Sequence, residues 1–242
     1  MKYVGVDGCK KGWFAIWLTD KNWAIGVFKD IATLWKKHKD ATLILVDIPI
    51  GLKDKGPGER LCDIEARKLL GPKRGSSVFP VPCRSAVYRK GKSASEINQQ
   101  KTGRQLSRQT LGIIPKIREM DRFLLKNRAA RLHIRETHPE ICFWSLFGDE
   151  PMKFRKRSKQ GYLARKSVLN SAYPQANNII KHALFIYRRK DVAKDDILDA
   201  LSAAVTARMS IKGLASIPEM PQPQSDSKGL RMEIVYHYGK SN

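Results

Sequence analysis

The chain has 242 residues, with 46 Lys and Arg against 23 Asp and Glu, and therefore a formal net charge of +23 at pH 7. Hydrophobic residues make up 42%, enough for a core, which excludes disorder as the default. No stretch reaches the roughly 20 apolar residues that cross a bilayer, and the N-terminus lacks the pattern of a signal peptide. We therefore expect a cytoplasmic protein with no membrane partner.

The positive charge is uneven along the chain. Residues 53–135 and 153–194 are strongly basic, whereas residues 136–152 contain acidic residues and no Lys or Arg. Basic surfaces attract phosphate groups, so the charge favours nucleic acid as a partner over anionic lipid or a merely solvated surface. It distinguishes neither DNA from RNA nor a monomer from an oligomer.

The first 50 residues show the pattern of a sheet with one helix. Apolar and β-branched runs predict strands at 2–6, 13–18 and 23–28. We expect a turn at Asp7-Gly8, after the first of them. Asp30 is a suitable N-cap for a helix over 31–38. The continuous apolar run 42–48 is typical of a strand buried on both faces.

A mostly helical insertion is predicted at about 52–130. Residues 52–92 are rich in Gly, Pro, Ser and Arg, with a short helix at 60–70. Residues 94–127 are mostly helical, and we expect a break near Gly112 and Pro115.

The rest of the chain returns to one strand and then to helices. We predict a strand at 131–137 and helices at 139–147, 162–187 (broken at Pro174) and 195–211. From about 213 the prolines predict a loose tail, with a late edge strand at 231–238. The fold class is therefore α/β, with a mixed five-stranded sheet flanked by helices in a single domain over 1–242.

Carboxylates fall where predicted strands end and where the last clear helix begins. Asp7 follows the first strand, Asp47 interrupts a run that should be buried, and Asp199 lies on the apolar side of helix 195–211. A buried carboxylate is costly unless it is paired or bound to metal, and converging carboxylate oxygens suit Mg²⁺ or Mn²⁺. Each alone is readily explained as a turn or a cap, as is Asp196.

The segment after the fifth strand has two interpretations. Glu136 is a candidate metal ligand, and His138 a candidate for positioning water or moving a proton. Alternatively, Thr137-His138-Pro139-Glu140 is an ordinary helix start, which we favour for Glu140.

Basic side chains in the insertion and near the first strand are candidates for substrate binding. Arg60, Arg67 and Arg84 could clamp phosphate, because a guanidinium fork matches phosphate oxygens, and Lys10 could contribute charge. The alternative is structural, with Arg60 or Arg67 paired to Asp63 on one helix.

Six motifs occur in order along the chain, and the family resemblance depends on the set. They are Gly5-Val6-Asp7-Gly8, Asp47-Ile48-Pro49-Ile50-Gly51, Arg60-x-Cys62-Asp63, Ser76-Ser77-Val78-Phe79-Pro80-x-Pro82, Glu136-x-His138-Pro139-Glu140 and Asp195-Asp196-x-x-Asp199-Ala200. Over roughly residues 2–210 the chain resembles domain-of-unknown-function family 429, whose members are predicted RNase H-like nucleases. The resemblance implies an RNase H-like fold that binds two divalent metals, with Asp7, Asp47 and Asp196 or Asp199 in the places of the acids.

We therefore predict a metal-dependent nuclease that hydrolyses nucleic-acid phosphodiesters with Mg²⁺ or Mn²⁺. Asp7, Asp47 and Asp199 would be catalytic, and the metal ligands would be Asp7, Asp47, Glu136, Asp196 and Asp199. One alternative is a nucleotide-dependent phosphotransferase of the actin-like branch. It is disfavoured because such enzymes usually need two cores of this fold and the chain has room for little more than one. The sequence also lacks a Gly-rich phosphate loop ending in Lys-Ser/Thr. The other is a non-catalytic nucleic-acid-binding module.

Overall fold

The centre of the molecule is one five-stranded sheet. The computed structural model describes residues 1–219 and 224–238. The strands are β1 (Lys2–Cys9), β2 (Gly12–Thr19), β3 (Trp23–Phe28), β4 (Leu43–Val46) and β5 (Ile134–Glu136), in the spatial order β3-β2-β1-β4-β5. The first three are antiparallel, and β4 and β5 run parallel to β1. The predicted mixed α/β sheet is confirmed, and its strand order agrees with an RNase H-like fold.

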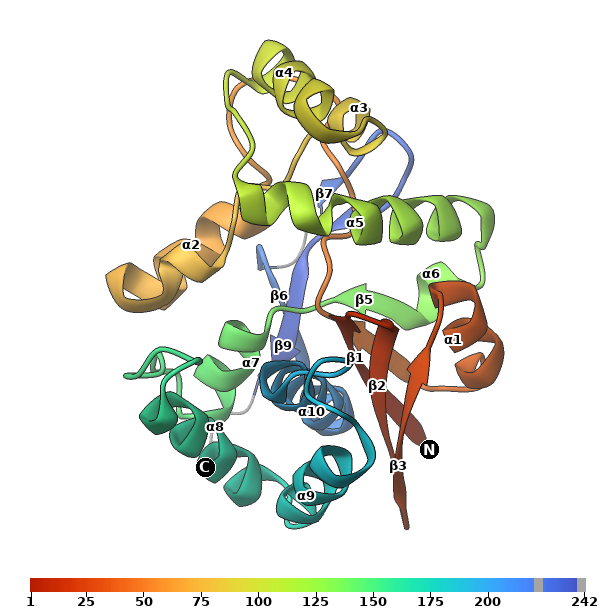
Figure 1. The fold of residues 1–242 in the computed structure, drawn as a ribbon, viewed down its shortest axis with the longest axis vertical. Helices are drawn as coiled ribbons and strands as arrows, with labels where there is room; N and C mark the ends of the chain where they lie inside the picture. The colour runs from red at the N-terminus through yellow and green to blue at the C-terminus, as the bar shows by residue number, and fades with distance from the viewer. Residues whose placement is uncertain (220–223, 239–242) are drawn as a thin grey trace.

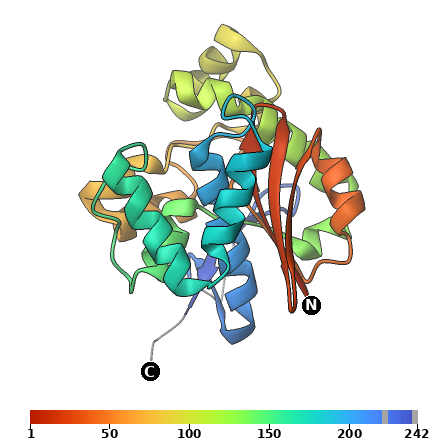
Figure 2. The same cartoon turned by 60° about the horizontal axis from the view of Figure 1, so that its bottom comes forward.

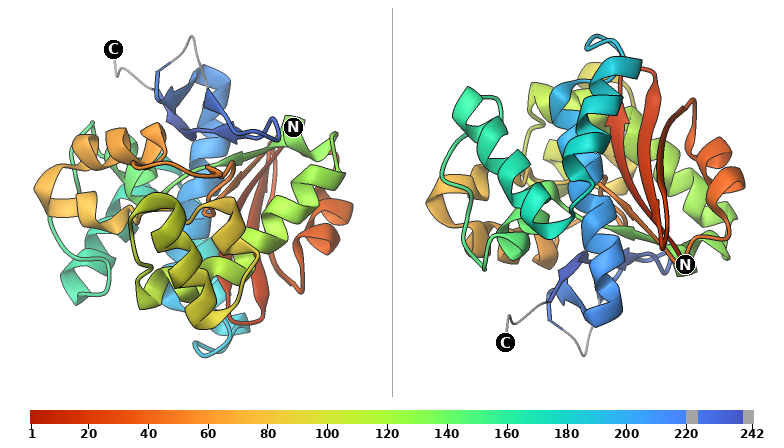
Figure 3. Two further views of the ribbon diagram at one scale, coloured as in Figure 1. Left: turned by 90° about the horizontal axis from the view of Figure 1, so that it is seen from above. Right: turned by 90° about the horizontal axis from the view of Figure 1, so that it is seen from below.

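Helices cover both faces of this sheet. On one face lie α9 (Ala176–Ile186) and α10 (Lys194–Met209), and on the other lie α1 (Ile31–His38) and α5 (Arg108–Lys126) (Figures 1 and 3). Successive side chains of a strand point to opposite faces of the sheet, and this explains the division. Trp13 and Ala15 of β2 pack toward α1 and α5, while Phe14 and Ile16 pack toward α9 and α10.

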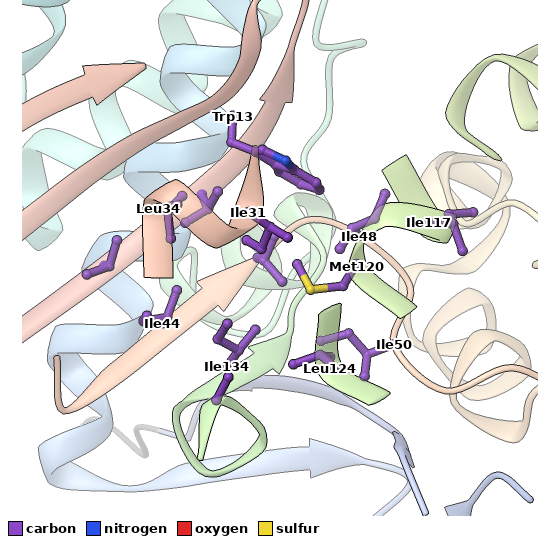
Figure 4. Packing of buried hydrophobic residues seen from close by; sticks show 14 of the residues in the cluster. Trp13, Ile31, Leu34, Ile44, Ile48, Ile50, Ile117, Met120, Leu124 and Ile134 are labelled. Atoms are coloured by element: carbon purple, nitrogen blue, oxygen red, sulfur yellow. The ribbon is translucent and has the colours of Figure 1, made fainter. Parts of the chain in front are cut away.

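The core between the sheet and α5 is built mainly from aliphatic side chains. Ile117, Met120 and Leu124 recur at helical spacing along α5 and meet Ile44 of β4 and Ile134 of β5 (Figure 4). This contact ties the insertion, which ends with α5, to the strands that carry the acidic residues.

The insertion contains α2 (Leu61–Arg74), α3 (Arg84–Val87), α4 (Gly91–Thr102) and α5, with a short 3₁₀ helix at Gly75–Ser77. The predicted break near Gly112 and Pro115 is wrong, because both residues lie inside α5. The chain breaks earlier, where Gly103 takes a left-handed conformation (φ 79°) after α4 and Ser107 caps α5.

The helices after β5 follow the prediction closely. They are α7 (Pro139–Leu146), α8 (Lys159–Ala172) and α9, and the break at Pro174 is confirmed. The strand predicted at 131–137 is shorter than expected, because its first residues belong to the short helix α6 (Ala130–His133) and β5 begins only at Ile134. Helices α8, α9 and α10 pack against one another on one side of the molecule (Figure 2). Among the described residues no helix is both long and apolar enough to traverse a bilayer.

The segment from about 213, predicted as a loose tail, is folded instead. After a 3₁₀ turn at Ser210–Lys212, β6 (Leu214–Ile217) pairs antiparallel with β9 (Ile234–His237), and β7 (Gln224–Ser225) pairs with β8 (Arg231–Met232). Ile217, Ile234 and Tyr236 are buried with residues of α2 and α7. The late strand therefore pairs in a small sheet of its own, not at the edge of the main sheet, because its apolar side chains cover helices there.

Candidate metal centre

Three aspartates from separate elements converge at one edge of the main sheet. Asp7 lies in β1, Asp47 comes directly after β4, and Asp199 lies in the second turn of α10. One carboxylate oxygen of each lies within 4.8 Å of the others. The structure thus brings together the three residues that the sequence predicts as catalytic.

Strand pairing places Asp7 beside Asp47. Val6 and Val46 are partners in the parallel pair of β1 and β4, and the Asp47 N–H donates to the Val6 carbonyl at 3.0 Å. The expected turn at Asp7-Gly8 is wrong: β1 continues to Cys9 because both residues pair with β2, so Asp7 sits within a strand. Its position is therefore fixed by neighbours on both sides.

A glycine places Asp199 against the other two carboxylates. A Cβ on Gly5 of β1 would lie 2.1 Å from both the Ala200 carbonyl oxygen and the Ala204 nitrogen of α10. Only glycine allows this approach of helix to strand. Because Asp199 precedes Ala200, the close contact brings its carboxylate over the edge of β1.

The three carboxylates are largely buried, and their like charges lie close together. Burial, together with the charges of Asp47 and Asp199, raises the pKa of Asp7 well above its usual range. Burial raises the pKa of Asp47 and that of Asp199 to about 6 in each case. Within the described chain no hydrogen bond reaches the carboxylate of Asp7 or Asp47. Carboxylate oxygens that are crowded together and lack hydrogen-bond donors suit a hard divalent cation such as Mg²⁺ or Mn²⁺.

Lys156 supplies a positive charge to this cluster, and the sequence did not single it out. Its Nζ donates to Asp199 Oδ2 at 2.6 Å, and the charges of Asp199, Asp47 and Asp7 raise its pKa above the usual lysine value in spite of burial. Lys156 lies in a run of basic residues, and nothing local distinguishes it from its neighbours. Only the tertiary fold identifies it.

Asp196 adjoins the three aspartates without joining them. Its carboxylate accepts a hydrogen bond from the Ala193 N–H at 2.8 Å, which caps α10, while burial raises its pKa to about 6. Asp196 and Asp199 both line a cleft of about 980 Å³. Asp196 is thus available to a ligand in the cleft, and its capping role is confirmed as well.

A second, smaller cavity leaves the cluster on the side of α5. It measures about 270 Å³ and is lined by Asp7 and Asp47 together with Gln109, Ile113 and Lys116 of α5. Asp7, Asp47, Gln109 and Ile113 line both hollows, so the smaller cavity continues the cleft toward α5.

Glu136, predicted as a metal ligand, is directed to another partner. Its oxygens accept from both terminal nitrogens of Arg60 at 2.7 and 2.8 Å, and from the Ile50 N–H at 2.6 Å. Arg60 also pairs with Asp63 at 2.6 Å, and its side chain is 2% exposed. The two predicted roles, metal ligand and phosphate clamp, do not fit this pair, because the buried guanidinium requires both carboxylates as counter-charges. The alternative pairing of Arg60 with Asp63 is confirmed.

The other basic residues predicted to bind substrate also lie outside the cleft. Arg67 pairs with Glu59 and donates to the Val78 carbonyl at 2.9 Å, and Arg84 pairs with Asp121 and Asp226 at 2.9 and 2.5 Å. Lys10 is exposed at the turn between β1 and β2. These arginines fasten parts of the fold to one another through ion pairs whose partners the helical spacing along the chain does not reveal.

His138 and Glu140 line the cleft beside the aspartates. The His138 Nδ1 accepts from the Glu140 N–H at 3.2 Å at the start of α7, and burial lowers the pKa of this histidine. Glu140 pairs with Arg165 at 2.5 Å. The helix-start interpretation of this motif is confirmed, and the His138 side chain also borders the cleft.

Comparison with known proteins gives one match. A family model described as a protein of unknown function, DUF429, matches residues 5–223. No curated protein and no solved structure matches the chain.

Proposed function

Because the chain belongs to DUF429, a family of unknown function, we propose its activity from the site itself: hydrolysis of nucleic-acid phosphodiester bonds with Mg²⁺ or Mn²⁺. The observation that supports this most is the convergence of the Asp7, Asp47 and Asp199 oxygens to within 4.8 Å. Carboxylates so close, with raised pKa values, favour a bound cation over a purely structural role.

The cation would be held by the three aspartates, and Asp196 would complete the set from the cleft. When bound, two such ions activate a water and stabilise the leaving oxygen in phosphodiester hydrolysis. Pairing of β1 with β2 and β4 holds Asp7 and Asp47 in place, and Gly5 allows α10 close enough for Asp199 to join them. The ligand set is therefore rigid before any substrate arrives.

Lys156 has a clear part in this scheme. In the metal-free protein its ammonium neutralises Asp199, and it lies in the wall of the cleft where a substrate phosphate would approach. A flexible four-carbon side chain can turn from Asp199 to a phosphate oxygen when a cation replaces it.

Hydrolysis accounts for the site better than nucleotide-dependent phosphotransfer. In the described residues the carboxylates face an open cleft bordered by Arg74, Arg155 and Arg157, a charge distribution suited to a polyanion. A non-catalytic module would gain nothing from three repelling carboxylates, because they oppose the approach of a phosphate unless a cation is bound.

The test is cleavage of single-stranded, duplex and branched DNA and RNA with Mg²⁺ or Mn²⁺. We expect cleavage of at least one substrate, abolished by EDTA and by Asp7→Asn. The charge-matched control is Asp40→Asn, an exposed residue outside the cleft that pairs with Lys2, and it should leave activity unchanged. No cleavage of any substrate, or equal activity in both variants, contradicts the proposal, and binding of ATP with no nucleic-acid binding would favour the phosphotransferase.

A further inference from the structure

A short basic loop, residues 152–158 between α7 and α8, forms part of the wall of the cleft. Its Arg155, Lys156 and Arg157 all line the cleft, and Lys156 reaches Asp199 at 2.6 Å. Arg155 is therefore adjacent in the chain to a residue that contacts the carboxylate cluster. This location makes the loop part of any substrate site built on the cluster.

Two arginines from other elements hold the backbone of this loop. Arg74, the last residue of α2, donates from Nε to the Met152 carbonyl at 2.7 Å and from Nη2 to the Lys153 carbonyl at 3.0 Å. Arg165 of α8 donates from Nη1 to the Phe154 carbonyl at 3.0 Å. Three successive carbonyl groups are thus fixed by charged donors, which is far more than a solvated surface loop requires.

The far end of the loop is fixed as well. The Arg155 carbonyl accepts from the Ser158 N–H at 3.0 Å and from its hydroxyl at 2.8 Å, and Ser158 caps α8. A Cβ on Gly161 would lie 1.9 Å from that same carbonyl oxygen. The backbone on both sides of Arg155 and Lys156 is therefore held in one conformation, so their side chains start from fixed points.

In this wall the described fold pairs Lys156 with Asp199 and Arg157 with Asp195 at 3.6 Å, but it leaves Arg155 without a counter-charge. Glu140 lies between Arg74, at 3.9 Å, and Arg165, at 2.5 Å, so one carboxylate serves two guanidinium groups. Among the described residues Arg155 has no carboxylate within ion-pair distance, and the Nη1 group of Arg74 has no hydrogen-bond partner. Donors that are positioned but unpaired favour an anion.

We propose that Arg74 and Arg155 form a phosphate subsite that binds the backbone phosphate next to the one being hydrolysed. This inference rests on the proposed function, because the aspartates define where the reacting phosphate lies. Glu140 and Arg165 then act as positioning residues, which hold the loop without touching the substrate. The substrate is a nucleic-acid strand that continues past the cleaved bond on the side of α8.

The first test measures anion binding without cleavage. Inorganic phosphate is titrated at constant ionic strength, in EDTA, into protein carrying Asp47→Asn, which weakens the repulsion of an anion by the cluster. We expect phosphate to raise the unfolding temperature, and addition of Arg155→Gln to weaken the affinity about tenfold or more. Arg128→Gln, an exposed arginine outside the cleft, makes the same charge change and should leave the affinity unaltered.

Phosphate that fails to bind, or that binds equally to the Arg155→Gln and Arg128→Gln proteins, overturns the subsite. The second test is kinetic, with the native aspartates and metal present: Arg155→Gln should raise KM about tenfold with kcat little changed. Equal KM values in the Arg155→Gln and Arg128→Gln enzymes also overturn it. Absence of cleavage in every protein rejects the proposed function alone, since the phosphate titration needs no metal and no activity.

Discussion

The crowding of carboxylates in the candidate metal centre has a direct consequence for stability. Burial raises the pKa of Asp47 to about 6, from 3.8 in an unfolded chain. A shift of about 2 units corresponds to roughly 3 kcal/mol, and screening by the water that reaches this partly exposed group reduces the effect to about 1–2 kcal/mol. We expect Asp47→Asn to stabilise the metal-free protein by that amount at pH 7.

The direction of the pH dependence follows from the same shift. Because the pKa of Asp47 is higher in the folded protein than in the unfolded chain, the folded state holds the proton more tightly. The stability of the metal-free protein therefore falls as the pH rises from about 4 to about 6, and stays low above that range. Asp47→Asn removes this contribution, so its advantage should be present at pH 7 and absent near pH 4.

Thermal unfolding in EDTA measures the effect. For a chain of 242 residues we expect the unfolding temperature to rise by about 3–6 °C at pH 7. The matched control is Asp63→Asn, where the carboxylate pairs with buried Arg60 at 2.6 Å, and this variant should lower the temperature. If Asp47→Asn lowers the unfolding temperature as Asp63→Asn does, the carboxylates do not repel one another and the reasoning is refuted.

Three further predictions follow from single contacts. Lys156→Met removes the ammonium that competes with a cation at Asp199, so calorimetry should show tighter Mn²⁺ binding than in the native protein; unchanged affinity would mean that Lys156 does not occupy the site. Gly5→Ala forces a Cβ into the backbone of α10, so urea unfolding should show that the free energy of unfolding falls by about 3 kcal/mol or more. The control is Gly103→Ala, at an exposed glycine with open space around it, which should lose only the smaller cost of an alanine at positive φ. Arg60→Gln leaves Glu136 and Asp63 buried without their partner, so it should lower the free energy of unfolding by about 3–5 kcal/mol. A normal stability for Arg60→Gln, with impaired nucleic-acid binding, would restore the phosphate-clamp role.

The elements that the sequence predicts well are those whose pattern is local. Periodicity and caps locate the strands of the sheet, the break at Pro174 and helix α10. The three clustered aspartates were predictable because each one interrupts an apolar element near its end, and parallel strands place such residues at one edge. Local pattern misjudged α5, where burial of one apolar face overrides Gly112 and Pro115.

Long-range pairing explains the roles that the sequence does not reveal. Glu136 is the last residue of β5 and Asp47 comes directly after β4, yet Glu136 is directed to Arg60, which lies 76 residues away in the chain. Lys156 reaches Asp199 from 43 residues away, out of a run of lysines and arginines that look alike. Charge type and spacing in the sequence identify candidate site residues. Which ion-pair partner each of them meets is decided by the packing of helices and strands that are far apart in the chain.

The basic residues behind the net charge of +23 include arginines that the fold pairs with carboxylates and others that it leaves unpaired. Arg60, Arg67 and Arg84 lie in the basic insertion, but each is already paired with carboxylates of the fold, so none of them is free to release counterions from a nucleic acid. The loop 152–158 instead presents Arg155 to the cleft without such a partner. On the proposed function, the salt dependence of nucleic-acid binding should therefore change more in Arg155→Gln than in Arg60→Gln, Arg67→Gln or Arg84→Gln.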